Sequence, residues 1–137
     1  MKSGIAGLLI FCLAWSGCSS HGGEEQKLIP VTGVITLNKK PLPKASVAFH
    51  PTQTGNSSFG RTNENGEYTL MFNGNKSGAV PGPHRVEIRT KEEIIDSEGK
   101  LVSEQRELLP AKYNDQSTLT AEVSDGNKTI NFELTAR

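Results

Sequence analysis

The chain has 137 residues, 15 basic and 15 acidic side chains, and a hydrophobic content of 34%. This length accommodates one domain and excludes a large multidomain enzyme. The neutral charge balance argues against a nucleic-acid-binding protein, which carries a basic excess. Two cysteines are too few for a small scaffold held together by disulfides. The aromatic content of 6% indicates a mainly aliphatic core.

Residues 1–17 have the pattern of a secretory signal peptide. Lys2 supplies a positive charge, and an apolar run over residues 5–15 follows it. This run is too short to cross the roughly 30 Å hydrocarbon core of a bilayer as a helix, and small residues come after it. A buried N-terminal helix is the alternative, but the run has no polar face. We therefore expect residues 1–17 to be removed during export.

Small residues precede the second cysteine of the chain: Ser16 and Gly17 come before Cys18, and Ser19 follows it. This arrangement resembles the lipobox of bacterial lipoproteins, although Trp15 stands where that motif prefers leucine. The resemblance implies cleavage before Cys18 and lipidation of its sulfur with diacylglycerol (fatty acyl chains such as palmitate). Two or more acyl chains anchor a protein stably, at about 0.8 kcal/mol per buried CH₂. The alternative is an ordinary signal peptide that leaves a free cysteine.

The sequence after the cysteine predicts a location and a linker. An aspartate after the lipidated cysteine retains some lipoproteins at the inner membrane, and its absence favours the outer membrane. Residues 19–27 contain no apolar side chain, so they cannot bury enough surface to order themselves. We expect residues 18–29 to form the lipidated cysteine and a flexible tether, and residues 30–137 to form the domain.

From residue 31 onward, apolar and polar residues alternate with the period of two that is typical of strands with one buried face. The predicted strands are 31–37, 45–50, 59–62, 68–72, 84–89, 119–123 and 130–134, with turns at 38–41, 63–66 and 125–126. His84 falls on the inward face of its strand. We expect the last two strands to form a hairpin. About seven short strands without a convincing helix predict an all-β sandwich.

Residues 91–107 differ from the rest, because nine of these seventeen side chains are charged. The apolar pairs 94–95 and 101–102 flank a turn at 96–99. We expect a projecting hairpin that is either a solvated loop or a protein-docking loop, since loops on a rigid scaffold commonly carry function. The candidate interaction residues are Glu92, Glu93, Asp96, Glu98 and Lys100.

Seven short stretches of the sequence carry motifs whose order along the chain is informative. They are 31–35, 41–42, 45–49, 62–68 and 81–86, followed by 109–114 and 132–134. Together they resemble the carboxypeptidase regulatory-like domain as found in small bacterial lipoproteins, over about residues 30–136. The resemblance implies a transthyretin-like (prealbumin-like) Greek-key sandwich that acts as a spacer or interaction module. Lys39 replaces the family's turn glycine, and His84 takes an aromatic position.

The resemblance implies no catalytic residues. The 5-hydroxyisourate hydrolases share this sandwich but end in Tyr-Arg-Gly-Ser, whereas this chain ends at 133–137 with Glu-Leu-Thr-Ala-Arg. The three histidines, His21, His50 and His84, are not grouped with the spacing of metal ligands. The turn at 63–66 lacks the acidic ends of a calcium loop. With no nucleophile elbow and no glycine-rich phosphate loop, we expect neither a metal nor a cofactor.

The expected function is that of a non-enzymatic, lipid-anchored envelope protein, acting as a structural or protein-interaction module. Its expected partners are membrane lipid and another envelope protein, and not nucleic acid. A carbohydrate- or small-ligand-binding module is the alternative and requires an exposed aromatic side chain. Four aromatic residues fall on inward faces: Phe49, Tyr68, Phe72 and Phe132. Only Phe59 and Tyr113 remain as candidates for the surface, because the single tryptophan leaves with the signal peptide.

Overall fold

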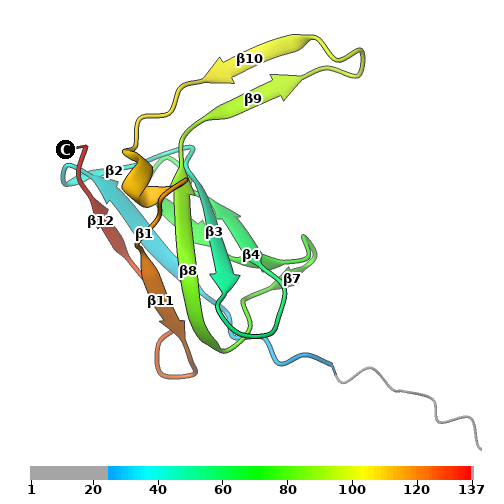
Figure 1. Ribbon diagram of the computed structural model, residues 1–137, viewed down its shortest axis with the longest axis vertical. Coiled ribbons are helices and arrows are strands. Elements are labelled where there is room, and N and C mark those ends of the chain that lie inside the picture. Colours follow the sequence, from blue (N-terminus) through cyan, green and yellow to red (C-terminus); the bar gives the residue numbers. More distant parts are fainter. Residues whose placement is uncertain (1–24, 137) are drawn as a thin grey trace, which may run out of the picture.

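The computed structural model describes residues 25–136 (Figure 1). Within these residues it contains twelve β-strands, one short 3₁₀ helix, η1 (Ala111–Tyr113), and no α-helix. Ten of these strands form two sheets that enclose one core, so the predicted all-β sandwich is confirmed, and the other two form a separate two-stranded sheet. The predicted signal peptide and the lipidation site at Cys18 lie outside the described residues.

The larger sheet has six strands in the order β11-β8-β3-β4-β6-β7, and all its neighbours pair antiparallel. The strands are β3 (Ser46–Pro51), β4 (Ser58–Arg61), β6 (Met71–Phe72), β7 (Lys76–Ser77), β8 (Gly82–Arg89) and β11 (Thr120–Val123). The apolar residues of β3 and β8 alternate as predicted, with one face buried and the other partly exposed. The outer face of β3 therefore meets solvent between β4 and β8.

The smaller sheet is built around β1 (Thr32–Leu37), which pairs in parallel with β12 (Phe132–Leu134). Strands β2 (Lys40–Pro41) and β5 (Glu67–Thr69) pair antiparallel with β1. Gly33 permits a close approach here, because a Cβ atom on it would lie 1.8 Å from the carbonyl oxygen of Ile130. The Tyr68 hydroxyl donates to that same oxygen at 2.5 Å. The glycine of the first strand is thus required by packing.

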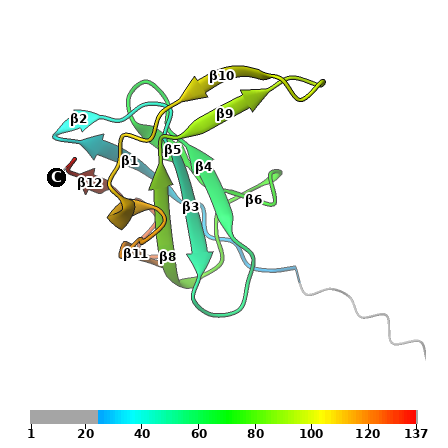
Figure 2. The same cartoon turned by 45° about the horizontal axis from the view of Figure 1, so that its top comes forward.

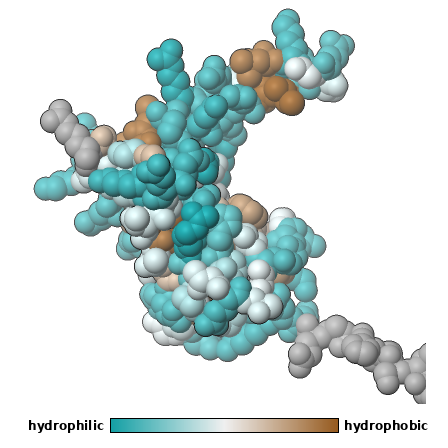
Figure 3. All heavy atoms as spheres, in the orientation of Figure 1, coloured by the Kyte–Doolittle hydropathy of each residue, from teal (hydrophilic) through white to brown (hydrophobic). Residues whose placement is uncertain are grey.

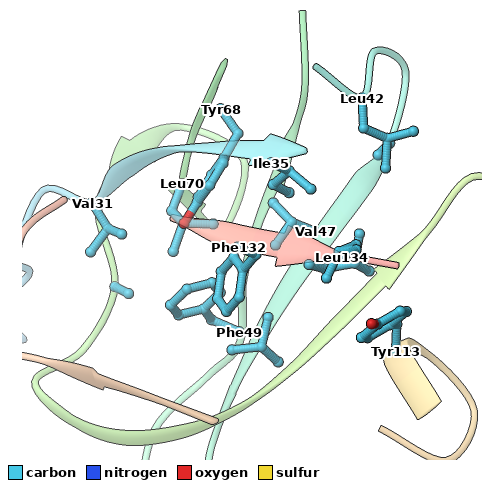
Figure 4. Close-up of a cluster of buried hydrophobic side chains, with 14 of the residues drawn as sticks. Val31, Ile35, Leu42, Val47, Phe49, Tyr68, Leu70, Tyr113, Phe132 and Leu134 are labelled. Carbon is cyan, nitrogen blue, oxygen red and sulfur yellow. The ribbon is translucent and has the colours of Figure 1, made fainter. Parts of the chain in front are cut away.

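Aromatic side chains from both sheets meet in the core (Figure 4). The ring of Phe49 lies 6.1 Å from that of Phe132 in an edge-to-face arrangement and 6.4 Å from that of Tyr68. His84 is 1% exposed, packs 5.7 Å from Phe49 and hydrogen-bonds the carbonyl of Gly82 through Nδ1 at 3.0 Å. The predicted inward position of this histidine is therefore confirmed.

The predicted hairpin between the last two strands is wrong. Strand β11 pairs with β8 in the larger sheet, whereas β12 pairs with β1 in the smaller one. Both Val123 and Phe132 are buried in the same core, and strands in opposite layers bury their inner side chains against each other. The turn closed by the bridge between Ser124 and Asn127 therefore carries the chain from one sheet to the other. The predicted strand 68–72 divides between the sheets in the same way, at Leu70.

A two-stranded ribbon projects from the sandwich, as predicted for residues 91–107 (Figures 1 and 2). It consists of β9 (Glu92–Ile95) and β10 (Leu101–Gln105). The ribbon leaves the sandwich after β8, at the end opposite to the one where the chain enters (Figure 1). Ile29, assigned to the tether, is buried and bridges to Ala79 at the entering end. The eight residues of β8 separate the two ends by about 25 Å.

Candidate functional site

The ribbon is fixed to the sandwich by hydrogen bonds at its base. The buried Thr90 hydroxyl accepts from the backbone N–H of Leu108 at 2.7 Å. The Glu107 carboxylate accepts from the backbone N–H of Thr90 at 3.1 Å, and Gln105 Nε2 donates to the Thr90 carbonyl at 2.7 Å. We call these groups the base knot. Because both strands are tied to one buried residue, the ribbon has a defined direction.

Glu92, one of the predicted interaction residues, also belongs to the base of the ribbon. Its two carboxylate oxygens each accept from the guanidinium of Arg61 at 2.5 Å. These hydrogen bonds lower the pKa of Glu92. Glu93 lies on the opposite face of β9, where it pairs with Lys91 at 3.1 Å. Both carboxylates are therefore engaged within the chain.

The tip of the ribbon contains the other three predicted residues. Asp96 Oδ1 accepts the backbone N–H groups of Glu98 and Lys100, each at 2.9 Å, and so closes the turn. Asn63 closes the turn at 63–66 in the same way, which shows why both turns begin with an Asp or Asn and contain a glycine three residues later. Of the predicted residues, Glu98 and Lys100 are thus the two whose side chains have no such role.

The most distinctive part of the ribbon surface is a group of exposed apolar side chains (Figure 3). Ile94, Ile95, Leu101 and Val102 are between 48% and 64% exposed. Ile94 and Ile95 are successive strand residues and point to opposite faces, while Ile95 pairs with Leu101 and the register shifts at Val102. We call these four side chains the apolar band. These four residues flank the predicted turn, although the candidate interaction residues were all charged. The signal for them in the sequence is the occurrence of four apolar residues in a strongly charged segment.

A second surface feature is a shallow trough on the outer face of the larger sheet. Strand register places Ala48 between Phe59 of β4 and Glu87 of β8, and Ser46 between Arg61 and Arg89. The small side chains form a floor between larger ones, leaving a volume of about 250 Å³. We call this hollow the sheet trough; its floor is Ser46 and Ala48, its walls are Phe59, Glu87 and Arg89, and His50 stands at one end.

The polar wall of the sheet trough is a network of charges. Arg85 Nη2 lies 2.8 Å from one oxygen of Glu87, and Arg89 Nη2 lies 3.3 Å from the other. Although partial burial raises the pKa of Glu87, the hydrogen bonds from Arg89 and Arg85 outweigh this effect and lower it. Arg89 also binds Asp115 at 3.0 Å. The Glu87 carboxylate is therefore ionised and held in one orientation.

His50 links this network to the aromatic wall. Its Nδ1 hydrogen-bonds Ser57 Oγ at 2.7 Å, and its ring lies edge-to-face against Phe59 with centroids 6.2 Å apart. Its Nε2 lies 3.5 Å from Glu87 and makes no hydrogen bond. Ser57, His50 and Glu87 thus have the relative placement of a nucleophile, a general base and an acidic residue that orients the base. However, the two guanidiniums already neutralise Glu87, which weakens its ability to stabilise a charged imidazole.

Of the two aromatic residues that the sequence predicts as candidates for the surface, one is exposed and the other is buried. Phe59 is 55% exposed, as predicted. The prediction for Tyr113 is wrong, because this residue is buried in η1 and its hydroxyl accepts the backbone N–H of Thr135 at 3.1 Å. The 3₁₀ helix turns the Tyr113 ring onto the core, and such a short helix has no periodic pattern in the sequence. Among the residues that the structure describes, Phe59 is therefore the one exposed aromatic side chain, and it forms a wall of the sheet trough.

A larger hollow of about 630 Å³ lies where the turn between β1 and β2 approaches β12. Its lining includes Asn38, Lys39 and Glu133 but no aromatic ring.

Within residues 25–136, no helix is long and apolar enough to cross a membrane, and no three acidic, histidine or cysteine side chains are grouped to hold a metal ion. The ribbon and the sheet trough are therefore the features with a distinctive chemistry.

The chain matches no known family model and no curated protein. It resembles part of a 9R-lipoxygenase from Cyanothece PCC8801, with 20% identity and a TM-score of 0.43 over 79% of this chain and 16% of that one. It also resembles part of the major pilin subunit of Bacillus cereus, with 17% identity and a TM-score of 0.39 over 80% of this chain and 29% of that one. The chain thus spans less than a third of either protein.

Proposed function

We propose that the protein is a lipid-anchored, non-enzymatic module of the bacterial envelope that docks another envelope protein through its ribbon. The proposal of an anchor is supported by the signal-like residues 1–17 and the lipobox-like residues around Cys18. The order of motifs along residues 30–136, together with the β-sandwich, supports a place in the carboxypeptidase regulatory-like family. The absence of an aspartate after Cys18 favours the outer membrane.

The apolar band carries the proposal of docking. Four exposed apolar side chains on one short ribbon form a surface that a soluble protein ordinarily covers. The band has side chains on both faces of the ribbon, so a groove that encloses it buries more apolar area than a flat surface does. The base knot holds the ribbon in place beforehand, which lowers the entropic cost of binding.

Position and charge favour a protein partner over the membrane. The ribbon extends from the end of the sandwich opposite to residue 25, where the chain would continue toward its anchor (Figure 1). Segment 91–107 carries six acidic and three basic side chains, and this net negative charge opposes contact with anionic lipid. Docking of the ribbon on a second copy of this chain is also disfavoured, because it would bring two such acidic segments together. The favoured partner is therefore a different protein with an apolar groove and basic residues around it.

The anchor is tested by metabolic labelling with a palmitate analogue. We expect Cys18→Ala to abolish labelling and to release the protein from membranes. Cys12→Ala is the matched control, because that residue lies within the predicted signal peptide and its loss leaves labelling unchanged. Membrane association that persists in Cys18→Ala, with label still incorporated, contradicts the anchor.

Docking is tested by a photo-crosslinking residue at Val102 in the native envelope, with the same residue at exposed Leu108 as the control. We expect one protein adduct from Val102, none from Leu108, and loss of the adduct when Ile95 and Leu101 are both changed to serine. Both serine substitutions lie on the surface and change the free energy of unfolding by less than about 0.5 kcal/mol each. Equal adducts from both positions, an adduct that survives the double substitution, or cross-links to lipid or to a second copy contradict the proposal.

A further inference from the structure

The sheet trough has a chemistry that the ribbon does not explain. One wall is the exposed ring of Phe59, and the other presents the Glu87 carboxylate and the Arg89 guanidinium. Ala48 faces both walls from the strand between them. An apolar plate opposite an acceptor and a donor suits a ligand with one C–H face and one hydroxylated edge.

The walls of the sheet trough are held in place before any ligand arrives. His50 is fixed by Ser57 at 2.7 Å and supports the Phe59 ring edge-on. Glu87 is held by Arg85 at 2.8 Å on the side away from Arg89. Ligands are bound more tightly by groups that do not have to be ordered on binding. The arrangement therefore has the properties of a binding site rather than of an ordinary solvated sheet face.

Charge and size limit the class of ligand. The positive charges of Arg85 and Arg89 are balanced by Glu87 and Asp115, so the sheet trough attracts neither an anion nor a cation. Its volume of about 250 Å³ lies below the roughly 300–1,000 Å³ of sites for drug-sized ligands. The space thus suits one small ring. We propose that the sheet trough binds a single neutral sugar ring, stacked on Phe59 with its hydroxyls directed at Glu87 and Arg89.

The proposal is tested by titrating the full-length protein, kept in a sugar-free detergent, with the methyl glycosides of glucose, galactose, mannose and N-acetylglucosamine. Backbone amide shifts are followed by NMR. We expect at least one glycoside to shift the amides of Ser46, Ala48 and Phe59 saturably, with a Kd on the order of 1 mM. Glucuronate and inorganic phosphate serve as charged probes, which we expect to bind more weakly.

Two variants remove different parts of the site. Phe59→Ala deletes the stacking plate and is expected to weaken binding about tenfold. Ala48→Leu leaves both walls in place but fills the floor, and is expected to abolish the shifts. Leu108→Ala removes an equally exposed apolar side chain elsewhere and is expected to change nothing.

Three results overturn the proposal. The first is the lack of saturable shifts at the sheet trough with any of the four glycosides up to about 50 mM, well above the expected Kd. The second is unchanged affinity in both Phe59→Ala and Ala48→Leu. The third is tighter binding of glucuronate or phosphate, which identifies an anion site instead. Changing Ile95 and Leu101 to serine leaves the sheet trough intact, so failure of docking and failure of sugar binding are distinguishable.

Discussion

The base knot can be tested by removing one oxygen atom. Thr90→Val keeps the shape of a buried side chain but deletes the hydroxyl that accepts from the Leu108 N–H at 2.7 Å and donates to the Arg106 carbonyl at 2.9 Å. Each lost hydrogen bond costs about 1 kcal/mol net, and the backbone groups left unpaired at the base add to this. We therefore expect the free energy of unfolding to fall by about 2 kcal/mol.

Urea unfolding and amide hydrogen exchange measure this effect. The Leu109 N–H, which donates to Glu107 in the same knot at 3.0 Å, is expected to exchange about 30-fold faster, as a loss of about 2 kcal/mol implies. Thr118→Val is the matched control, because Thr118 is exposed, and its change in stability is expected to stay within about 0.5 kcal/mol. If Thr90→Val is as mild as the control, or if the Leu109 amide stays as protected as in the parent protein, the ribbon is not held by this knot.

Three further predictions follow from the core and the sheet trough. Gly33→Ala places a methyl group 1.8 Å from the Ile130 carbonyl oxygen and is expected to cost about 3 kcal/mol or more in urea unfolding; a loss below about 1 kcal/mol contradicts the required close approach. Burial lowers the pKa of His84 against the opposing effect of its hydrogen bond to Gly82, so below about pH 6.5 the unfolded chain binds a proton that the folded one does not. The free energy of unfolding therefore decreases as the pH falls below 6.5, and His84 contributes at most about 1.4 kcal/mol per pH unit to this decrease. His84→Phe is expected to flatten the dependence of stability on pH. An identical dependence in both proteins refutes the assignment of this effect to His84. A fluorophosphonate probe is expected to leave Ser57 unlabelled, and covalent labelling that disappears in Ser57→Ala would show a reactive nucleophile and contradict the non-enzymatic proposal.

The local sequence pattern predicted the positions of the strands well but their pairing partners poorly. The alternation along 45–50 and 84–89 located β3 and β8 and their buried faces, because burial of one face imposes a period of two. The partner of a strand depends on residues far away in the chain, and the hairpin expected between β11 and β12 failed for that reason. Tyr113 was misplaced because a helix of three residues carries no period.

The surface features differ in how far the sequence revealed them. The unusual charge of 91–107 pointed to the ribbon, although the exposed apolar residues within it are its more distinctive part. The sequence alone does not reveal the sheet trough, because the trough depends on the register of three strands. Only that register places the small side chain of Ala48 between Phe59 and Glu87. Taken singly, Ala48, Phe59 and Glu87 are ordinary strand residues.

The parallel pairing of β1 with β12 has a consequence for the order in which the protein folds. Ile35 on the first strand faces Phe132 on the last, so the smaller sheet cannot close until nearly the whole chain is available. A chain that emerges from its N-terminus can pair β1 with β2 and β5 early, but it lacks the β12 partner of β1 until synthesis is almost complete. Such long-range closure is slow compared with local pairing. The core residues Phe132 and Leu134 on β12 are thus among the last to join, so the sandwich is completed only at a late stage of folding.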